Sequence, residues 1–331
     1  MRIVLVSDAW FPQVNGVVRT LSRVKEEIEA LDHQVTVIAP DLFRTLPCPT
    51  YPDIRLALPR QRRLAAMIDD ADPDALHIAT EGPLGLAVRR LCLKRDWPFT
   101  TSFHTRFPEY IQARALIPPD WTYALLRRFH NTAAAVMVAT QSVRSELCAR
   151  GFTNIRPWSR GVDTALFRPN PEKVFDRPSP IFLYVGRVAV EKNIQAFLDL
   201  DLPGSKVVVG DGPQLAKLRR SYPEVLFTGA KFGEDLARAY ASGDVFVFPS
   251  RTDTFGLVLL EALACGVPVA AFPVPGPRDV INGAKVGILD EDLANAARQA
   301  LTIPRAECRD YALTYTWQRS AEQFLSNLAP R

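Results

Sequence analysis

The feature that most constrains the fold of this chain is an alternation between short β-branched apolar runs and segments with helical spacing. The alternation occurs twice. The first series contains RIVLVSD (2–8), QVTVIAP (34–40), ALHIAT (75–80), FTTSFHT (99–105) and AVMVAT (135–140). The second contains IFLYVGR (181–187), KVVVGDG (206–212), VLFTGA (225–230), DVFVFPS (244–250) and VPVAAFP (267–273). Continuous apolar strands separated by helices are typical of buried parallel sheets, so the sequence predicts an α/β chain with two doubly wound sheets.

The two series are separated by a proline-rich stretch, LFRPNPEKVFDRPSP (166–180), which holds four prolines and has no clear periodicity. Such a stretch indicates a linker. We therefore predict an N-terminal domain over 1–165 and a C-terminal domain over 166–314. The last helical stretch lies beyond the second series, and we expect this C-terminal helix, over 315–331, to pack back onto the first domain.

Composition limits the compartment and the membrane topology. The five cysteines are scattered and none forms a Cys-x-x-Cys pair, so a reduced, cytoplasmic protein without a Cys-based zinc site is expected. The longest apolar region, 255–274, is interrupted by Glu261, two glycines and two prolines. Because of these interruptions, the region is a poor candidate for a membrane span.

Positive charge is concentrated in the first half of the chain. Residues 1–165 carry 21 Lys and Arg against 17 Asp and Glu, whereas residues 166–331 carry 19 of each. The excess lies in PRQRR (59–63), RRLCLKR (89–95) and RR (127–128). Such runs are either solvated helix faces or a surface that attracts anionic phospholipid. Nucleic acid is disfavoured because the runs have no interleaved aromatic residues.

Polar residues stand where the predicted strands end. Ligands of open α/β sheets bind outside the carboxyl ends of the strands, so these residues are candidates for a site. The first series delivers Asp8, Glu81 and His104, and PQVNGVVRTL (12–21) places Gly16 at the head of the first helix. Glycine there lets a ligand approach the backbone closely. A plain helix cap and a structural histidine are the alternative interpretations.

The second series delivers cations and glycines. VGRVAVEKN (185–193) places Arg187 and Lys192 between a strand and a helix, which favours a phosphate site, although two surface cations are the alternative. VVVGDGPQLAKL (207–218) places Gly210 and Gly212 at a second strand–helix junction. This junction lacks the third glycine of a dinucleotide fingerprint and by itself indicates a tight turn.

Two carboxylates flank the turn that follows the strand VFVFPS (245–250). In RTDTFGLVLLEALACG (251–266), Asp253 precedes a predicted helix over 257–264, and Glu261 lies about two helical turns along it. An unpaired glutamate in so apolar a helix is costly, so it needs hydroxyl or N–H donors. A ribose offers a pair of hydroxyls, and a structural salt bridge is the alternative.

Together with SRGVDTALFRP (159–169), these motifs resemble the family 4 glycosyltransferases of GT-B fold, which are retaining enzymes that use nucleotide sugars. The resemblance covers nearly the whole chain and is most specific in residues 181–280. It implies two Rossmann-like domains that face each other across a cleft. The family's Glu-x7-Glu motif is Asp253-x7-Glu261 here. The Thr-Asp-Thr-Phe-Gly form resembles a subset that glycosylates lipids, including sulfoquinovosyl- and glucuronosyl-diacylglycerol synthases and GDP-mannose-dependent lipid mannosyltransferases.

The resemblance implies roles for the candidate residues. Asp253 would hold donor-sugar hydroxyls, Glu261 would hold the ribose, and His104 would lie beside the donor sugar. Arg187 and Lys192 would neutralise the diphosphate and complete the catalytic set. The remaining donor-binding candidates are Gly16, Gly210, Gly212, Phe232, Thr254, Phe255, Gly256 and Leu257, with the base near 230–233. Asp8 and Glu81 are candidates for binding an acceptor hydroxyl.

The implied reaction moves a hexosyl group from a UDP- or GDP-sugar to a hydroxyl, commonly explained by same-face attack with the leaving phosphate helping to accept the proton. No cofactor and no metal are expected, because Arg187 and Lys192 supply positive charge. The Asp-x-Asp strings at 70–74, 199–201 and 290–292 are interpreted as solvent-facing. An NAD-dependent oxidoreductase is disfavoured because no dinucleotide fingerprint follows the first strand. The catalytic set disfavours a silent sugar-nucleotide-binding subunit.

The expected acceptor is a lipid such as diacylglycerol. Arg60, Arg62 and Arg63 precede the apolar run LAAMI (64–68), and cations flank the helix around 89–95. A basic helix face with apolar residues beside it can lie on an anionic bilayer. We therefore predict a cytoplasmic protein bound peripherally to the inner face of the membrane. The alternative is a mannosyl- or glucosyltransferase that acts on a soluble or lipid-linked saccharide.

Overall fold

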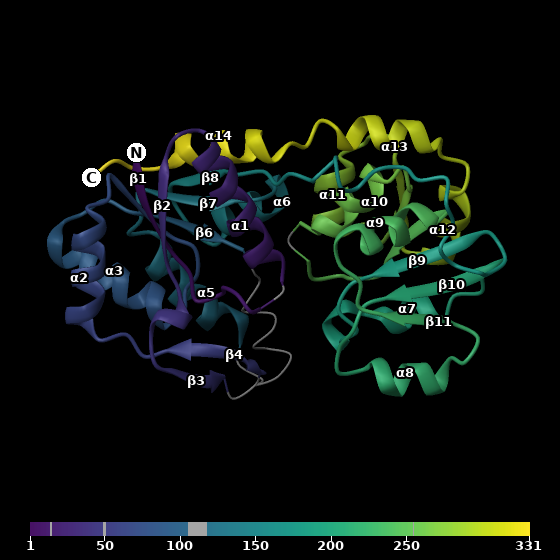
Figure 1. Ribbon diagram of the computed structural model, residues 1–331, viewed down its shortest axis with the longest axis horizontal. Coiled ribbons are helices and arrows are strands. Elements are labelled where there is room, and N and C mark those ends of the chain that lie inside the picture. Colours follow the sequence, from purple (N-terminus) through teal and green to yellow (C-terminus); the bar gives the residue numbers. More distant parts are fainter. Residues whose placement is uncertain (14, 49–50, 105–117, 254) are drawn as a thin grey trace. The chain divides into compact units, whose positions relative to one another are not determined.

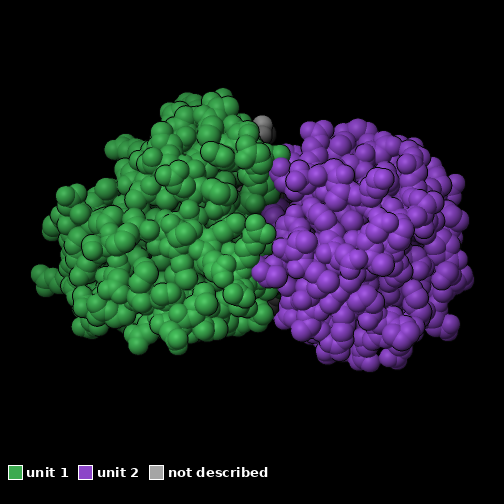
Figure 2. Space-filling model, turned by 90° about the horizontal axis from the view of Figure 1, so that it is seen from above, with its two compact units in different colours: residues 1–160, 317–331 green, residues 161–316 purple. Residues whose placement is uncertain are grey.

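The chain divides into two compact units. The computed structural model describes residues 1–13, 15–48, 51–104, 118–253 and 255–331. Unit 1 comprises Met1–Arg160 and Trp317–Arg331, and unit 2 comprises Gly161–Thr316 (Figure 2). The division thus falls a few residues before 165/166 and two residues after 314/315, where the sequence places it. The proline-rich stretch 166–180 forms neither helix nor strand and lies in unit 2.

Unit 1 is built on a six-stranded parallel sheet in the order β2-β1-β5-β6-β7-β8. Its strands are β1 (Arg2–Val6), β2 (Gln34–Ile38), β5 (Ala75–Ile78), β6 (Thr100–Phe103), β7 (Ala135–Val138) and β8 (Ile155–Pro157). Its helices are α1 (Gly16–Ala30), α2 (Gln61–Ala71), α3 (Pro83–Arg95), α5 (Pro119–His130), α6 (Gln141–Ala149) and α14 (Trp317–Asn327), with a short 3-10 turn η1 (Pro40–Leu42).

Helices cover both faces of this sheet. On one face α14, the last helix of the chain, lies alongside α1 (Figure 1), and Phe324 packs with Ile3, Leu5 and Leu21. On the other face α2, α3 and α5 share one apolar core with the strands. The core residues they contribute recur at helical spacing: Leu64 and Ile68 of α2, Leu84, Val88 and Leu91 of α3, and Phe129 of α5. This spacing explains why the segments form amphipathic helices.

A β-hairpin stands apart from the main sheet of unit 1. It consists of β3 (Thr45–Cys48) and β4 (Tyr51–Ala57), which pair antiparallel in a two-stranded sheet of their own. The hairpin was not predicted, because its prolines and charged residues interrupt the apolar pattern that marks buried strands. It occupies the chain between β2 and α2.

Unit 2 is built on a second six-stranded parallel sheet, in the order β11-β10-β9-β12-β13-β14. Its strands are β9 (Ile181–Val185), β10 (Ser205–Val209), β11 (Leu226–Gly229), β12 (Val245–Phe248), β13 (Val269–Ala271) and β14 (Gly287–Leu289). Its helical elements are η2 (Val190–Lys192), α7 (Ile194–Leu198), α8 (Leu215–Ser221), α9 (Gly233–Ser242), α10 (Leu257–Ala264), α11 (Pro275–Ile281), α12 (Leu293–Ala300) and α13 (Arg305–Ala312).

The predicted fold class is confirmed, since both units are doubly wound parallel sheets. Every strand of the two predicted series is present, and α10 spans the predicted 257–264. The last strand of each sheet, β8 and β14, was missed. Each is three residues long and lacks the continuous apolar run of β13, which is equally short, because β8 contains Arg156 and Pro157 and β14 begins with Gly287. Within the described residues, no helix has the length and apolar character that a membrane span requires.

Candidate functional site

The crevice of unit 2 lies where its strand order reverses, between β9 and β12. In doubly wound sheets this is the place where ligands bind. The loops that follow these two strands meet there. Asn193 Nδ2 donates to the Pro249 carbonyl oxygen at 3.0 Å, and Thr252 Oγ1 donates to the Glu191 carbonyl oxygen at 3.2 Å. These two bonds hold the loops against each other.

The same two loops bring together Lys192 and Asp253. Lys192 Nζ lies 2.5 Å from Asp253 Oδ1, and the two side chains are only 24% and 19% exposed. The other carboxylate oxygen, Asp253 Oδ2, is buried and finds no hydrogen-bond donor among the described residues. The same holds for the buried hydroxyl of Ser250, three residues earlier. Buried polar atoms without partners are costly, so both atoms are suited to hydrogen bonding with a polar ligand.

Arg187 follows β9 in the first of these loops and is exposed. Its carbonyl oxygen accepts a hydrogen bond from the Tyr184 hydroxyl at 2.8 Å, which fixes the backbone at the start of the loop. Burial, and to a lesser extent the nearby Asp253 and Glu191 carboxylates, raise the pKa of Tyr184, so it stays a hydrogen-bond donor. The loop therefore presents an exposed guanidinium on a fixed backbone.

The helix after this loop differs from the expected one. Asn193 adopts a left-handed conformation with φ of 51°, and α7 that follows is only five residues long. So short a helix adds little dipole to a phosphate site. Positive charge at this edge of the sheet comes instead from the side chains of Arg187 and Lys192.

The glycines after β10 are explained by close packing of two loops. A Cβ at Gly210 would stand 1.9 Å from the Gly186 carbonyl oxygen, and a Cβ at Gly212 would stand 2.4 Å from the Val188 carbonyl oxygen. Gly16, at the first turn of α1 in unit 1, is different, because a Cβ there would meet no atom of the described residues within 4 Å. Packing within the protein therefore requires glycine at 210 and 212 and does not require it at 16.

Glu261 lies on α10 with its side chain turned into unit 2. It is 7% exposed, and its Oε2 accepts a hydrogen bond from the Tyr240 hydroxyl of α9 at 2.7 Å. A tyrosine hydroxyl thus meets part of the hydrogen-bonding demand that the apolar helix creates. This contact orients the carboxylate, and no spacing pattern in the sequence signals it.

The other donor-binding candidates of unit 2 lie around α9 and α10. Phe232, just before α9, has a ring that is 61% exposed, although large apolar rings are usually buried. Phe255 is 7% exposed, and Gly256, the N-cap residue of α10, has φ of 85°, a left-handed conformation that favours glycine. Leu257 is the first residue of α10 and is partly buried. Thr254 lies outside the described residues.

His104 follows β6 in unit 1 and has both ring nitrogens engaged. Nε2 lies 2.8 Å from Ser102 Oγ, and Nδ1 lies 3.3 Å from Arg160 Nη2. An arginine can only donate, so Nδ1 is the acceptor and the proton of the neutral ring is on Nε2, which donates to Ser102. Burial lowers the pKa of His104 well below its usual value, and the charge of Arg160 lowers it further. The ring is therefore neutral at physiological pH.

A second histidine extends this network into the core. His77, on β5, is completely buried, and its two nitrogens lie 2.9 Å from Thr100 Oγ1 and 3.1 Å from Ser102 Oγ. Burial lowers the pKa of His77 to about 3. Arg160 is 4% exposed, and its Nη1 donates to the Trp158 carbonyl oxygen at 2.7 Å. The buried hydrogen bonds thus run without interruption from Arg160 through His104 and Ser102 to His77.

The two acceptor candidates of unit 1 already have partners. Asp8 accepts from the backbone N–H of Leu84 at 2.9 Å and of Gly85 at 3.2 Å, and from Thr80 Oγ1 at 3.0 Å. Asp8 therefore caps the N-terminus of α3, although burial raises its pKa. Glu81 Oε1 lies 3.1 Å from Nε2 of the buried His130. The geometry gives both carboxylates structural roles.

Sequence reasoning did not single out Ser250, Arg160 and Tyr240. Ser250 and Arg160 stand in motifs that signal the site, FPSRTD and SRGVD, where position alone could have drawn attention to them. Tyr240 has no such signal, because its partner lies 21 positions away on another helix.

The Asp-x-Asp strings face the surface as interpreted. Asp72 and Asp74 pair with Arg2, and their side chains are 57% and 42% exposed. Asp292 caps α12 by accepting from the Asn295 N–H at 3.0 Å. Among the described residues, no three His, Cys, Asp or Glu side chains are grouped so that they could hold a metal ion.

Comparison with known proteins identifies the family. The model described as Glycosyltransferase Family 4 matches residues 14–166, and the model described as Glycosyl transferases group 1 matches residues 179–303. The chain is 31% identical over 316 residues to a GDP-mannose-dependent alpha-mannosyltransferase of Mycobacterium tuberculosis, which covers 87% of this chain and 83% of that protein. It is 29% identical to an alpha-monoglucosyldiacylglycerol synthase of Streptococcus pneumoniae, over 98% of this chain and 83% of that protein.

A solved structure supports the same fold. Sucrose-phosphate synthase from Thermosynechococcus elongatus superposes with a TM-score of 0.78 at 21% identity, covering 98% of this chain and 97% of that one. The two family models, the sequence relatives and this superposition agree. The chain belongs to glycosyltransferase family 4 and has the GT-B fold.

Proposed function

We propose that this glycosyltransferase moves a hexosyl group from a UDP- or GDP-sugar to a hydroxyl of a lipid acceptor such as diacylglycerol. The observation that carries the donor half is the pair of Lys192 and Asp253 at the crevice of unit 2. Beside that pair, Asp253 Oδ2 and Ser250 Oγ are buried and have no hydrogen-bond partner among the described residues. Sugar hydroxyls both donate and accept, so they can satisfy both atoms.

The donor diphosphate requires positive charge at the same place. Lys192 Nζ pairs with Asp253 at 2.5 Å, and the Lys192 ammonium and the Arg187 guanidinium are cations of the kind that bind phosphate oxygens. As the bond to the sugar breaks, charge grows on the departing phosphate, and fixed cations nearby lower the barrier. We therefore assign leaving-group stabilisation to Arg187 and Lys192, and no metal ion is required for it.

The residues that contact the base, the ribose and the sugar of the donor are assigned from their burial, exposure and hydrogen bonds. Phe232, with its exposed ring, offers a stacking surface for the nucleotide base. Glu261, whose carboxylate is oriented by Tyr240, accepts hydrogen bonds from the ribose hydroxyls. We assign His104 a place beside the sugar as a neutral group, since its lowered pKa makes it a weak base. A sugar hydroxyl that hydrogen-bonds to the ring would replace Ser102 or Arg160 as its partner.

We further propose that the reaction retains the anomeric configuration. The acceptor hydroxyl attacks from the face that the phosphate leaves, and its proton passes to that phosphate. The carboxylates Asp8 and Glu81 already have internal partners, so neither is assigned as the base.

The acceptor half rests on the names of relatives and on charge. One relative is named for a diacylglycerol product, and the basic runs of the first half of this chain lie in unit 1. We propose that the protein works in the cytoplasm, bound peripherally at the inner face of the membrane.

A donor screen tests this proposal. Purified protein is incubated with diacylglycerol in mixed micelles and, in turn, with UDP-glucose, UDP-galactose, UDP-glucuronate and GDP-mannose. Lipid products are detected by mass spectrometry, and the configuration of the new bond is read by proton NMR. A glycolipid with retained configuration, formed in the presence of EDTA, is the expected result. An inverted product or dependence on a divalent ion would contradict the mechanism.

A parallel series with soluble and lipid-linked saccharides tests the acceptor. If such a saccharide is glycosylated and diacylglycerol is not, the enzyme is a mannosyl- or glucosyltransferase of saccharide assembly, and the lipid assignment is wrong. The donor site in unit 2 is unaffected by that outcome.

A further inference from the structure

Helix α3 of unit 1 exposes apolar side chains to solvent. Leu86 and Leu93 are each 47% exposed and lie two turns apart, with the exposed Arg90 between them. The opposite side of the helix is buried in the core of unit 1. Surface helices usually present polar residues to water, so leucines along the outer stripe are unusual.

Helix α5 repeats this pattern more strongly. Trp121 is 76% exposed and Leu125 is 66% exposed, and Arg128 follows at the next turn. These three residues have the spacing i, i+4, i+7 and so lie along one stripe. The other side of α5 is buried through Tyr123, Leu126 and Phe129, which shows that the stripe is the outer face.

Arg89 links α3 to the C-terminal end of α5. Its Nη2 donates to the Arg128 carbonyl oxygen at 3.0 Å and its Nε to the Phe129 carbonyl oxygen at 3.1 Å. Its guanidinium also lies 5.8 Å from the centre of the Phe129 ring. We call the combined surface the α3–α5 face. It consists of Leu86, Arg90, Leu93 and Lys94 of α3 and Trp121, Leu125 and Arg128 of α5.

This face is basic. Its exposed cations are Arg90, Lys94 and Arg128. The other two cations of α3 have partners within unit 1, since Arg89 bonds to α5 and Arg95 pairs with Asp69. Helix α5 contains two arginines and one acid, Asp120, and Asp120 pairs with Arg150 of the α6 end at 3.1 Å. Cations interleaved with leucine and tryptophan favour an anionic, partly apolar partner.

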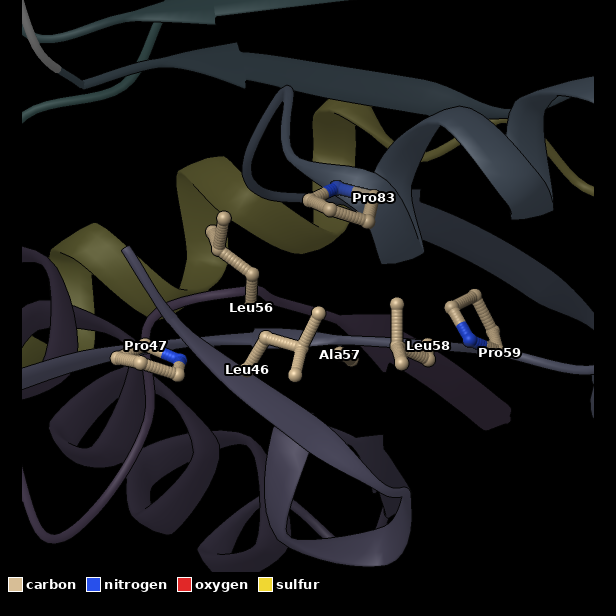
Figure 3. Close-up of a pocket in the computed structure, with 7 residues that line it drawn as sticks. All are labelled: Leu46, Pro47, Leu56, Ala57, Leu58, Pro59 and Pro83. Atoms are coloured by element: carbon tan, nitrogen blue, oxygen red, sulfur yellow. The ribbon is translucent and has the colours of Figure 1, made fainter. Parts of the chain in front are cut away.

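An apolar groove adjoins the first turn of α3. Its walls are Leu46, Leu56 and Leu58 of the hairpin segment, together with Pro59 and Pro83, and its volume is about 490 Å³. Figure 3 shows the leucines pointing to the side on which Pro83 lies. Leu46 and Leu58 are 55% and 52% exposed. Pro83 lines the groove and lies about one helical turn before Leu86. The groove therefore continues the exposed apolar surface of α3.

Of the two helices that the sequence favoured for membrane contact, α2 does not have such a face. In α2, Leu64 and Ile68 are both completely buried in the core of unit 1, and Met67 is partly buried. The apolar side of α2 is therefore used in folding. Its arginines, Arg60, Arg62 and Arg63, are exposed without a large apolar residue of α2 beside them.

We propose that the α3–α5 face docks unit 1 onto a bilayer that contains anionic phospholipid. Trp121 and the leucines enter the headgroup region, where an indole is favoured, and Arg90, Lys94 and Arg128 contact lipid phosphates. This proposal rests on the proposed lipid acceptor, because docking brings the enzyme to a substrate that stays in the membrane. It names the surface that makes the contact.

Vesicle flotation tests the docking. The full chain is mixed, without donor, with vesicles of phosphatidylcholine alone or with phosphatidylglycerol, at low and high salt. One variant combines Arg90→Glu with Arg128→Glu, and a second combines Trp121→Ser with Leu125→Ser. The matched control combines Lys217→Glu with Arg220→Glu, which makes the same charge change on exposed residues of α8 in unit 2.

Wild-type protein is expected to float with phosphatidylglycerol and to be released by salt, because screening shortens the reach of the charges. The variants Arg90→Glu/Arg128→Glu and Trp121→Ser/Leu125→Ser should each lower binding roughly tenfold or more, and the control by less than about twofold. The fluorescence of Trp121 should shift to the blue on binding, and Trp121→Phe should remove that shift while keeping most of the binding.

Three outcomes would overturn the proposal. They are failure to float at low salt, equal loss in the control, and Trp121-dependent self-association without vesicle binding, which would make a second copy the partner. Nucleotide-sugar binding, measured by calorimetry on the same samples, separates this test from the proposed function. Intact donor binding without flotation removes the docking face alone, whereas lost donor binding contradicts the enzyme assignment.

Discussion

Each unit has a carboxylate at the point where the strand order of its sheet reverses, and the two carboxylates differ in their hydrogen bonds. In each sheet the strand order reverses at one point, between β1 and β5 in unit 1 and between β9 and β12 in unit 2. At the first point Asp8 has both oxygens occupied by donors of its own unit. At the second, Asp253 keeps Oδ2 without a donor among the described residues. Hydrogen-bond accounting thus separates a carboxylate whose two oxygens both have donors from one that can still accept a hydrogen bond.

The strands of the two sheets also differ in the polarity of the side chains that they bury. The central strands of unit 1 bury His77, Thr100, Thr101 and Ser102, which bond to one another and to α5. The strands of unit 2 present almost uniformly apolar side chains to the core. Unit 1 thus uses polar groups on its strands to position His104, whereas the polar groups of unit 2 lie in loops and on helices, as Glu261 of α10 and Tyr240 of α9 do.

The largest effect should come from breaking the crevice of unit 2. Lys192→Ala removes a cation from a largely buried pair and should lower kcat/KM by about 30- to 1000-fold, equivalent to about 2–4 kcal/mol. Steady-state kinetics with the best donor measure it, with Lys217→Ala on the surface of α8 as the control. Unchanged kinetics with every donor would remove Lys192 from the site.

Replacing glycine by alanine at two positions should distinguish a glycine needed for internal packing from a glycine needed for ligand binding. Gly210→Ala drives a methyl group into the Gly186 backbone and should destabilise unit 2 by about 2–3 kcal/mol. Gly16→Ala has open space, so the melting temperature of unit 1 should hold while donor affinity falls. Calorimetric melting and donor titration are the readouts. Equal destabilisation by both changes would contradict the distinction.

Asp8→Ala should act on stability and spare the donor site. The substitution leaves the first N–H groups of α3 without their carboxylate, which should cost about 1–2 kcal/mol. Chemical denaturation of the variant measures the loss, and Asp8→Asn should recover part of it. Weaker nucleotide-sugar binding in a folded Asp8→Asn protein would instead give Asp8 a role in binding.

Acid should weaken unit 1 before unit 2. Because the pKa of His77 is about 3 in the fold and near 6.5 when unfolded, the unfolded state binds the proton first as the pH falls. Stability is therefore complete above about pH 6.5 and declines below it, by about 1.4 kcal/mol per pH unit for this residue. Hydrogen exchange of β5 amides between pH 6.5 and 5 follows the decline. His77→Asn should flatten the slope, and an equal slope in the variant would assign the effect elsewhere.

The smallest effect should be a change in donor preference. Asp253→Glu moves the carboxylate by about 1.5 Å, which disturbs hydroxyl contacts more than phosphate contacts. The order of donor sugars should change while nucleoside diphosphate affinity stays within about twofold. Competition assays with mixed donors measure it. An unaltered order would show that Asp253 does not contact the sugar.

Features that follow from local sequence patterns could be predicted, whereas most contacts between residues far apart in the sequence could not. The strands and α10 follow from local patterns, and the rule on strand ends brought Lys192 and Asp253 to one crevice although they are 61 positions apart. Arg160 was not foreseen because its contact with His104 spans 56 positions and follows no period. Asp8 was placed correctly at a strand end, but its partners are backbone N–H groups, which every sequence contains. The hairpin was missed because exposed strands need no continuous apolar run.

The return of the chain to unit 1 sets the order in which the protein can be completed during synthesis. Residues 317–331 belong to unit 1, yet they are synthesised after all of unit 2. Until then Trp158 lacks the Ser320 carbonyl that accepts its indole N–H at 3.2 Å, and His77 lacks the Phe324 ring that covers it at 4.8 Å. A nascent chain that stops short of Trp317 can finish unit 2 but leaves the histidine network of unit 1 open to water. Residues 317–331 therefore complete unit 1, most of which is synthesised before unit 2.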